Sequence, residues 1–159
     1  MSQNLTNHGP KIALFEPDIP QNTAAIIRLS ACLNMKVHLI EPCSFSLEDK
    51  RFKKVVMDYM NKNQIYRYES FQDLKEKNRR SRIILMTTKS SKSYLNFKYQ
   101  QNDIFLLGRE SKGVPEMIHK LADKKIKIPI KKETRSLNVA IAAAIISSEA
   151  LRQTKLFQK

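Results

Sequence analysis

The chain has 159 residues, a length typical of one domain with its own hydrophobic core. Its 29 Lys and Arg residues outnumber 15 Asp and Glu residues, and the net charge of +14 favours a polyanionic partner, although a generally lysine-rich proteome would give the same composition. No apolar run is long enough to span a bilayer, and residues 1–10 lack the basic and apolar regions of a signal peptide. We therefore expect a cytoplasmic protein with no membrane partner.

Short apolar runs alternate with helical patterns, which is typical of an α/β fold with a mostly parallel sheet flanked by helices. We expect residues 1–10 to be a polar tail and residues 11–159 to form a single domain. In chain order the pattern predicts a strand at 12–15, a helix from Asn22, a strand at 37–40, a basic helix at 49–57, a strand at 65–68, a helix at 71–77, strands at 83–87 and 104–107, a helix opened by Pro115, a strand at 126–130 and a helix at 137–157.

Single residues predict the ends and faces of three elements. Asn22 is a residue type that often caps a helix, so the first helix is expected to begin there, with Ile26, Leu29 and Leu33 on its inner face. Pro129 cannot donate a ladder hydrogen bond, which predicts that the last strand ends the sheet. The final helix is apolar on more than one face and needs two burial partners, of which one is the sheet and the other could be a second subunit.

The chain shows no cluster of metal-binding side chains in its sequence. Its two cysteines, Cys32 and Cys43, do not form a CxxC pair, and its three histidines are scattered. No metal is therefore expected.

Three polar segments follow predicted strands, at the edge where α/β sheets bind ligands. Fingerprints of common nucleotide-binding and hydrolytic sites, such as GxGxxG, the Walker lysine motif and GxSxG, are missing from the sequence. The first segment contains Asn22 and Arg28, six residues apart on the first helix, and we expect both to face one cleft. The simpler explanation is a helix cap and a solvated charge.

The second and third segments combine glycines, a carboxylate and positive charge. Gly108 and Gly113, two of only three glycines, flank Glu110, which indicates positive φ or a close approach of the backbone to a ligand, although an ordinary turn also fits. In the third segment Ser136 or Asn138 can cap the last helix, whose exposed amides would suit an anion. The basic side chains there suit phosphate, or simply form a basic loop; they are Lys131, Lys132 and Arg135.

Together the three segments resemble the three motifs of the SpoU branch of the SPOUT methyltransferases, in the order N-x-x-x-x-x-R, L-G-x-E-x-x-G-x-P, and I-P with S-L-N. The resemblance covers residues 11 to 153. Further matching stretches narrow it to the small single-domain subgroup that modifies the ribose of the tRNA wobble nucleotide; they are residues 40–42, 49–51, 58–59, 87–89 and 149–153. The chain departs from the family pattern at Ala24, Ala25, Ala140 and Ser148.

The resemblance implies a deep trefoil knot in the C-terminal part, S-adenosylmethionine as the cofactor, and an active site at the interface of a homodimer. The substrate would be the anticodon stem-loop of a tRNA, expected to be a leucine tRNA. The methyl group would go to the ribose 2′-oxygen of nucleotide 34, a cytidine or a modified uridine. The positions that match the family's cofactor contacts are Met86, Leu107, Gly108, Ile128, Ser136 and Leu137.

The resemblance also nominates Arg28 to face the 2′-hydroxyl. Because a guanidinium normally stays protonated, stabilising a developing alkoxide is physically easier for it than accepting a proton, although both roles stay open. Asn22, Glu110 and Asn138 are expected to complete the catalytic site, Glu110 by pairing with an arginine. The positions expected to contact RNA are Arg28, Lys50, Arg51, Lys131, Lys132 and Arg135.

Two other functions fit the same residues. One is a sister enzyme that methylates another tRNA position or rRNA; the lack of an additional RNA-binding domain in this sequence counts against rRNA. The other is a non-catalytic RNA-binding protein that keeps the fold. A titration with S-adenosylmethionine separates these functions, because a non-catalytic relative need not bind the cofactor.

Overall fold

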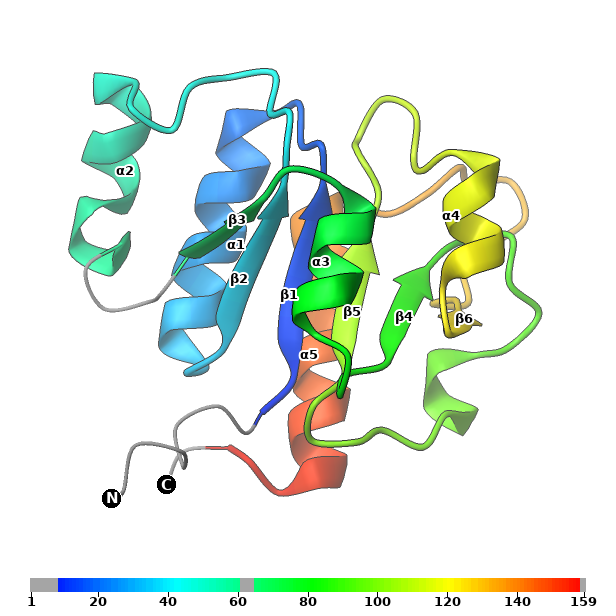
Figure 1. Ribbon diagram of the computed structural model, residues 1–159. Coiled ribbons are helices and arrows are strands. Elements are labelled where there is room, and N and C mark those ends of the chain that lie inside the picture. Colours follow the sequence, from blue (N-terminus) through cyan, green and yellow to red (C-terminus); the bar gives the residue numbers. More distant parts are fainter. Residues whose placement is uncertain (1–8, 61–64, 158–159) are drawn as a thin grey trace.

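Six parallel strands form one sheet between two layers of helices (Figure 1). The computed structural model describes residues 9–60 and 65–157, so most of the expected N-terminal tail, residues 1–8, lies outside the described residues. The strands are β1 (Lys11–Phe15), β2 (Lys36–Ile40), β3 (Ile65–Tyr68), β4 (Ile83–Met86), β5 (Ile104–Leu107) and β6 (Lys124–Ile126). The expected α/β fold with a parallel sheet is confirmed.

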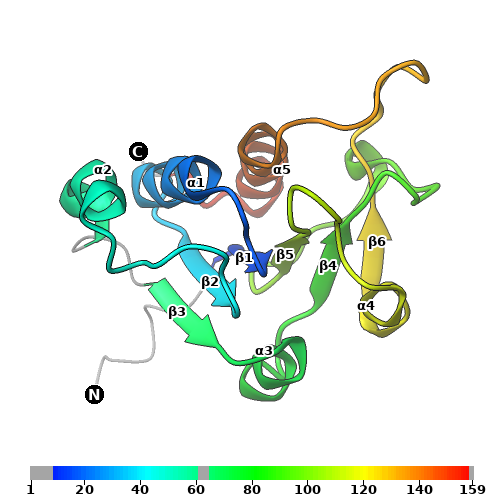
Figure 2. The ribbon, with the colours of Figure 1, turned by 90° about the horizontal axis from the view of Figure 1, so that it is seen from above.

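Helices cover both faces of the sheet, which is why the central strands are mostly apolar. Seen from above, α1, α2 and α5 lie over one face, and α3 and α4 lie over the other (Figure 2). The helices are α1 (Pro20–Cys32), α2 (Lys50–Met60), α3 (Phe71–Lys77), α4 (Glu116–Leu121) and α5 (Val139–Thr154).

The core divides according to the two faces of the sheet. On one face, Ile12 and Leu14 of β1 pack with Ile26 of α1 and Ala143 of α5. On the other face, Ala13 and Phe15 of β1 pack with residues of α3, α4 and the neighbouring strands, among them Phe71, Leu74, Leu106 and Ile118. Successive residues of β1 thus serve opposite layers, as the alternation of side chains along a strand requires.

The strand order, β3-β2-β1-β5-β4-β6, creates a switch point in the middle of the sheet. The chain builds outward from β1 through β2 to β3, and then crosses to β4 and β5 on the other side of β1. In doubly wound sheets the crevice beyond the carboxyl ends of the strands at such a point is the usual ligand site. The fold therefore directs attention to the carboxyl ends of β1, β5 and β4.

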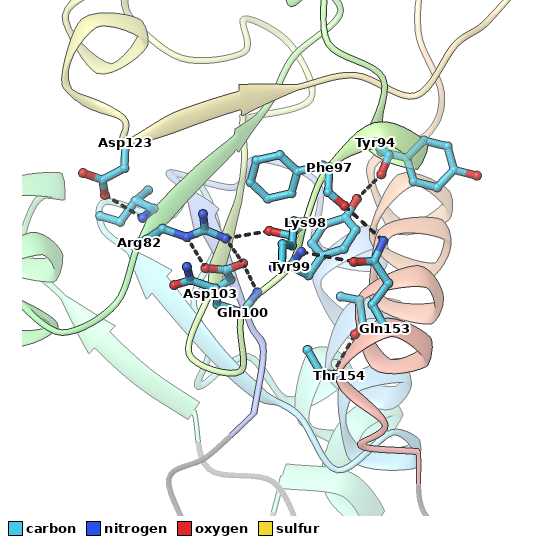
Figure 3. Close-up of polar contacts among 12 residues, drawn as sticks. Arg82, Tyr94, Phe97, Lys98, Tyr99, Gln100, Asp103, Asp123, Gln153 and Thr154 are labelled. Carbon is cyan, nitrogen blue, oxygen red and sulfur yellow. Dashed lines mark hydrogen bonds and ion pairs between the residues drawn. The ribbon is translucent and has the colours of Figure 1, made fainter.

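The C-terminal half of α5 is tied to the segment that connects β4 and β5 (Figure 3). The Gln153 side-chain NH2 donates to the Phe97 carbonyl at 3.0 Å, and its oxygen accepts from the Tyr99 N–H at 3.2 Å. In the same segment, Asp103 is fully buried and receives two hydrogen bonds of 2.8 Å from the Arg82 guanidinium. The Gln153 contacts hold the C-terminal end of α5, at the opposite end of the helix from the turn that lines the cavity.

Two predicted boundaries are wrong in ways that affect the site. The first helix begins at Pro20 rather than Asn22, and Ile19 occupies its cap position, because proline suits the first helical turn, where no N–H is needed. Asn22 therefore lies inside the helix and its side chain is free for other contacts. The last strand is residues 124–126, not 126–130, since the Lys127 N–H bonds to the Lys92 carbonyl instead of to β4. Its predicted place at the edge of the sheet is confirmed.

The final helix is shorter than the predicted span of 137–157. Asn138 caps it, as the sequence suggested, by accepting hydrogen bonds from the N–H groups of Ala140 at 2.8 Å and Ile141 at 3.3 Å. The helix ends before Lys155, which adopts a left-handed conformation with φ of 58°. Left-handed residues are a common way to end a helix.

Candidate functional site

A cavity of about 580 Å³ lies at the carboxyl ends of β4 and β5. Its walls come from the start of α1, the loop after β5, the segment after β6 and the first turn of α5. All six positions that the family resemblance assigns to the cofactor line this cavity; they are Met86, Leu107, Gly108, Ile128, Ser136 and Leu137. Segments distant in the chain therefore converge where the strand order predicts a ligand site.

Three of the expected catalytic residues form one hydrogen-bonded chain along the cavity wall. The Asn138 side-chain NH2 donates to the side-chain oxygen of Asn22 at 3.0 Å, and the Asn22 NH2 donates to Glu110 Oε1 at 3.4 Å. The oxygen of Asn138 is meanwhile occupied by the first amides of α5. Both orientable amides are thus held in place, so the groups they present to a ligand are fixed before it binds.

Asp18, which the sequence analysis did not single out, completes this network. Its backbone N–H donates to Glu110 Oε2 at 3.1 Å, and Asp18 Oδ1 accepts from the Glu110 N–H at 3.2 Å. The Ser111 hydroxyl donates to the other carboxylate oxygen of Asp18. The only sequence signal was a polar side chain between two prolines just after the first strand, because the partners are more than 90 residues away.

The two carboxyl groups titrate in opposite directions. Contact with the Glu110 carboxyl and the Ser111 hydroxyl lowers the pKa of Asp18 to about 2. Burial, and then the proximity of Asp18, raise the pKa of Glu110 above its ordinary value. Glu110 therefore takes up a proton at a higher pH than Asp18 does.

The predicted pairing of Glu110 with an arginine is wrong for the part of the chain that the structure describes, where its side chain bonds to Asn22 and Asp18. The neighbouring Arg109 makes the ionic contacts instead. Its guanidinium lies 3.4 Å from Glu16 Oε2 and 3.7 Å from Asp18 Oδ2, and donates to Ser44 Oγ at 3.3 Å. Arg109 thus fastens the loop after β5 to the loop after β1.

The two glycines of this loop serve different purposes. Gly113 has a φ of 65°, which favours glycine, whereas a Cβ on Gly108 would lie 2.7 Å from the Cα and carbonyl carbon of Gly113. Reciprocal backbone hydrogen bonds between Arg109 and Gly113, of 3.1 and 2.8 Å, close the loop. The expected close approach at Gly108 is therefore to the opposite limb of its own loop, which is one wall of the cavity.

Arg28 does not line the cavity of its own chain, contrary to the expectation that it shares a cleft with Asn22. Six residues advance the helix by about 600°, so Arg28 points about 120° away from Asn22 around α1. Its side chain is exposed, and its guanidinium carbon lies 5.4 Å from the ring centroid of Tyr59 on α2. The fold thus separates Arg28 from the other three candidates within one chain.

The basic residues expected to bind RNA fall into two groups. Arg135 lines the cavity, and Lys131 and Lys132 are exposed in the same segment before α5. Lys50 and Arg51 lie on α2, and Arg51 is paired with Asp49 at 3.4 Å. Of the two groups, only the first adjoins the cavity.

His119 is a further cavity residue that the sequence did not reveal. It lies on α4 and is about nine-tenths buried. Within residues 9–60 and 65–157, no group of three or more His, Cys, Asp or Glu side chains is placed to hold a metal ion. Over the same residues, no helix is long and apolar enough to cross a membrane.

Comparisons with known proteins agree with the motifs. Residues 10–148 match the SpoU rRNA Methylase family. A protein of Ancylobacter novellus called tRNA (cytidine(34)-2′-O)-methyltransferase is 43% identical over 150 residues, which cover 93% of this chain and 95% of the relative. An Escherichia coli K12 protein of the same name is 35% identical, over 89% of this chain and 92% of the relative.

The fold has solved counterparts. A structure described as "Structural insights into the 2-OH methylation of C/U34 on tRNA" superposes with a TM-score of 0.87 at 31% identity, over 92% of this chain and 97% of the other. The family assignment rests on three findings: a match to the family over 139 residues, relatives at 35–43% identity, and a shared fold. The chain belongs to the SpoU methylase family.

Proposed function

We propose that this chain transfers a methyl group from S-adenosylmethionine to the ribose 2′-oxygen of nucleotide 34 in a tRNA. The observation that carries the proposal is the convergence of Asn22, Glu110 and Asn138 on one cavity, in a chain whose relatives are named for this reaction. The proposal takes residues 11–159 as a single methyltransferase domain that works in the cytoplasm, where tRNA is found.

The cavity fits this cofactor in size and in the chemistry of its walls. Small-molecule sites span roughly 300–1,000 Å³, and this one measures about 580 Å³. Met86, Leu107 and Ile128 offer apolar surface for a purine and a carbon chain, while Ser136 and the backbone around Gly108 offer hydrogen bonds to polar ends. When bound, S-adenosylmethionine supplies a methyl group already activated by a sulfonium.

The chain's own residues must then orient the ribose and stabilise the charge that develops on its oxygen. The fixed amides of Asn22 and Asn138 can hold the sugar in line with the cofactor, which contributes to the rate through proximity. A guanidinium can stabilise the developing alkoxide. Arg28 is our candidate for that role, and its position outside the cavity of its own chain requires a second subunit.

We infer a homodimer in which the first turns of α1 and α5 meet their counterparts. Three large apolar side chains near the cavity are exposed: Ile19 at 41%, Leu137 at 38% and Ile141 at 53%. A two-fold interface there would cover them and bring Arg28 of the partner subunit toward this cavity. The predicted second burial partner of the final helix would thus be another copy of the chain.

We also infer the knot that the resemblance implies. The segment after β6 starts at the outer edge of the sheet and returns to α5 over its centre, and it lines the same cavity as the loop after β5 (Figure 2). A knot would require this segment to pass through a loop formed by the preceding chain. An experimental chain trace in which it passes outside that loop would contradict the inference.

The test of the function is methylation of tRNA taken from cells that lack the gene, with methyl-labelled S-adenosylmethionine, followed by nucleoside mass spectrometry. We expect label on the ribose of nucleotide 34, and purified leucine tRNAs test the narrower expectation about the substrate. Label at another tRNA position or in rRNA would favour a sister enzyme. A protein that binds tRNA but shows no heat of binding with S-adenosylmethionine would be a non-catalytic relative.

A further inference from the structure

Most of the unbalanced positive charge lies in two stretches of chain. Residues 83–102 and 124–138 contain nine basic residues and one acidic residue, Glu133, so they carry a net charge of +8 out of +14. Three of the basic residues, Lys131, Lys132 and Arg135, are already candidates for RNA contact. We call five of the others the basic edge; they are Lys89, Lys92, Lys124, Lys125 and Lys127.

The fold brings these two stretches together along the outer margin of the sheet. β6 is one of the two edge strands of the sheet, and the segment that follows β4 runs beside it (Figure 2). The Lys127 N–H donates to the Lys92 carbonyl at 2.8 Å, and the Ser90 hydroxyl donates to the Lys125 carbonyl at 2.9 Å. The positions of these lysines are therefore fixed by backbone contacts, although the residues lie more than 30 positions apart in the chain.

The lysines of the basic edge lack acidic partners among the described residues. Several basic side chains on other elements are paired: Lys53 with Glu48, Lys77 with Asp73, and Arg152 with Glu149. None of the five lysines of the basic edge makes an ion pair within residues 9–60 and 65–157. The Lys92 ammonium instead lies 5.5 Å from the ring centroid of Phe97.

The basic edge also adjoins the cavity. Lys89 lines the cavity, as does Arg135 on the segment that continues from β6. Unpaired ammonium groups next to a cleft attract phosphates, and their binding to a polyanion releases counterions. We propose that the basic edge binds the sugar-phosphate backbone of the RNA substrate and holds the strand beside the cavity. The proposal rests on the proposed function, since it assumes an RNA substrate.

Lysines on an edge strand have another known use, which is to hinder pairing with the edge of another sheet. That use would explain Lys124 and Lys125 on β6. It does not explain Lys89 and Lys92, which lie outside any strand. The two explanations differ in what happens to RNA binding when charge is removed.

The test compares two variants that lose the same charge from different places. The edge variant is Lys92→Gln/Lys125→Gln/Lys127→Gln. The control is Lys75→Gln/Arg79→Gln/Arg80→Gln, in α3 and in the turn before β4, at the opposite end of that strand from the cavity. The affinity for tRNA is measured over a series of salt concentrations, and calorimetry with S-adenosylmethionine tests whether the cavity is intact.

We expect the edge variant to bind tRNA at least tenfold more weakly at low salt. The slope of log K against log salt should fall by roughly two to three, since each lost phosphate contact removes about 0.7–0.9. The control should keep the wild-type slope, and both variants should keep the wild-type affinity for S-adenosylmethionine. If the triple variant does not fold, each single substitution should still lower the slope by about 0.7–0.9.

Failure of this proposal can be told apart from failure of the proposed function. If the wild type methylates tRNA and the edge variant keeps its slope, the basic edge does not bind RNA and the enzyme assignment stands; aggregation of that variant would then favour edge protection. If the wild type binds RNA through the basic edge but methylates none, the proposed function fails instead. A wild type that binds no RNA would overturn both.

Discussion

At the scale of the residue, Arg28 shows that the fold can separate two residues of one sequence motif. It lies six positions after Asn22, about 9 Å along the helix axis, yet outside the cavity that Asn22 lines. The spacing suggested proximity because it is nearly two turns, but the angle around the helix turns the two side chains apart. In the homodimer that we propose, α1 would face another subunit and Arg28 could act on the cavity of that subunit.

If Arg28 stabilises charge only in the transition state, Arg28→Ala should lower the single-turnover rate at saturating tRNA by roughly 10²–10³. The affinity for S-adenosylmethionine should hardly change, because ground-state binding does not use this side chain. Arg28→Lys should restore part of the rate, since a point charge does not reproduce a planar guanidinium. A near-normal rate with weaker tRNA binding would make Arg28 a phosphate anchor.

Gly108 permits a second prediction at this scale. A Cβ there would lie 2.7 Å from backbone atoms of Gly113. Because backbone atoms cannot move aside as a flexible side chain can, Gly108→Ala must push apart the loop that forms one wall of the cavity. We expect at least a tenfold loss of affinity for S-adenosylmethionine in calorimetry, with a folded protein by circular dichroism. As a control, Ala25→Gly removes a methyl group from an exposed position of α1 and should leave that affinity unchanged. Unaltered binding by Gly108→Ala would remove this loop from the cofactor site.

At the scale of the element, α5 is held at both ends by polar contacts that the sequence pattern alone does not reveal. Asn138 fixes its first turn against Asn22. Gln153 fixes its last turns against the backbone of residues 97–99, as Figure 3 shows. The apolar periodicity predicted the helix, and Asn138 was one of two candidate caps, but the hydrogen-bond partners of Asn138 and Gln153 lie 116 and 56 residues away. Long-range partners of this kind follow from the topology, which local spacing does not encode.

The ion pair of Asp103 with Arg82 anchors the same region. Asp103 is fully buried, and its carboxylate also accepts from the Gln100 N–H at 2.8 Å. Arg82→Met should leave a buried, unpaired carboxylate and cost up to about 3–5 kcal/mol of unfolding free energy. The double variant Arg82→Met/Asp103→Leu should cost less than the sum of the two single variants in urea titrations. Additive effects would mean that the pair contributes no coupling.

The burial of each strand explains how well the sequence predicted it. Four strands are short apolar runs, and their type and order follow from the sequence because burial on both faces leaves little choice of residue. β6 was misplaced because Lys124 and Lys125 are polar, as an exposed edge strand allows. The start of α1 was misplaced because the capping preference of Asn22 was weighed above Pro20, which suits the first turn better.

At the scale of the whole molecule, the exposed apolar residues near the cavity predict association. Ile141→Asp should place a charge in the proposed interface of α5 and shift sedimentation from dimer to monomer at micromolar concentrations. Met117→Asp, on α4 over the other face of the sheet, is a matched change at an exposed apolar residue and should leave the dimer intact. A wild type that sediments as a monomer would contradict both the dimer and the role of Arg28 across it.

A buried histidine gives the molecule a predictable response to acid. His38 lies in β2, is 2% exposed, and stacks on Tyr68 with a centroid distance of 5.2 Å and an interplanar angle of 6°. Neither of its ring nitrogens has a hydrogen-bond partner among the described residues. Burial, and then the charges of Lys11 and Lys36, lower the pKa of His38 to about 3. The fold therefore requires the neutral ring.

The pKa of His38 in the folded protein lies below the ordinary value of 6.5. Between these two pKa values the unfolded chain therefore binds more protons than the folded protein does, so acid favours unfolding. The stability that comes from keeping the ring neutral is complete above pH 6.5 and is lost as the pH falls from 6.5 toward 3, by up to about 1.4 kcal/mol per unit. His38→Leu should remove this part of the slope in urea titrations between pH 7 and pH 4. If His38→Leu loses stability with acid as steeply as the wild type, the slope belongs to other groups, and the histidine is not the source of the acid sensitivity.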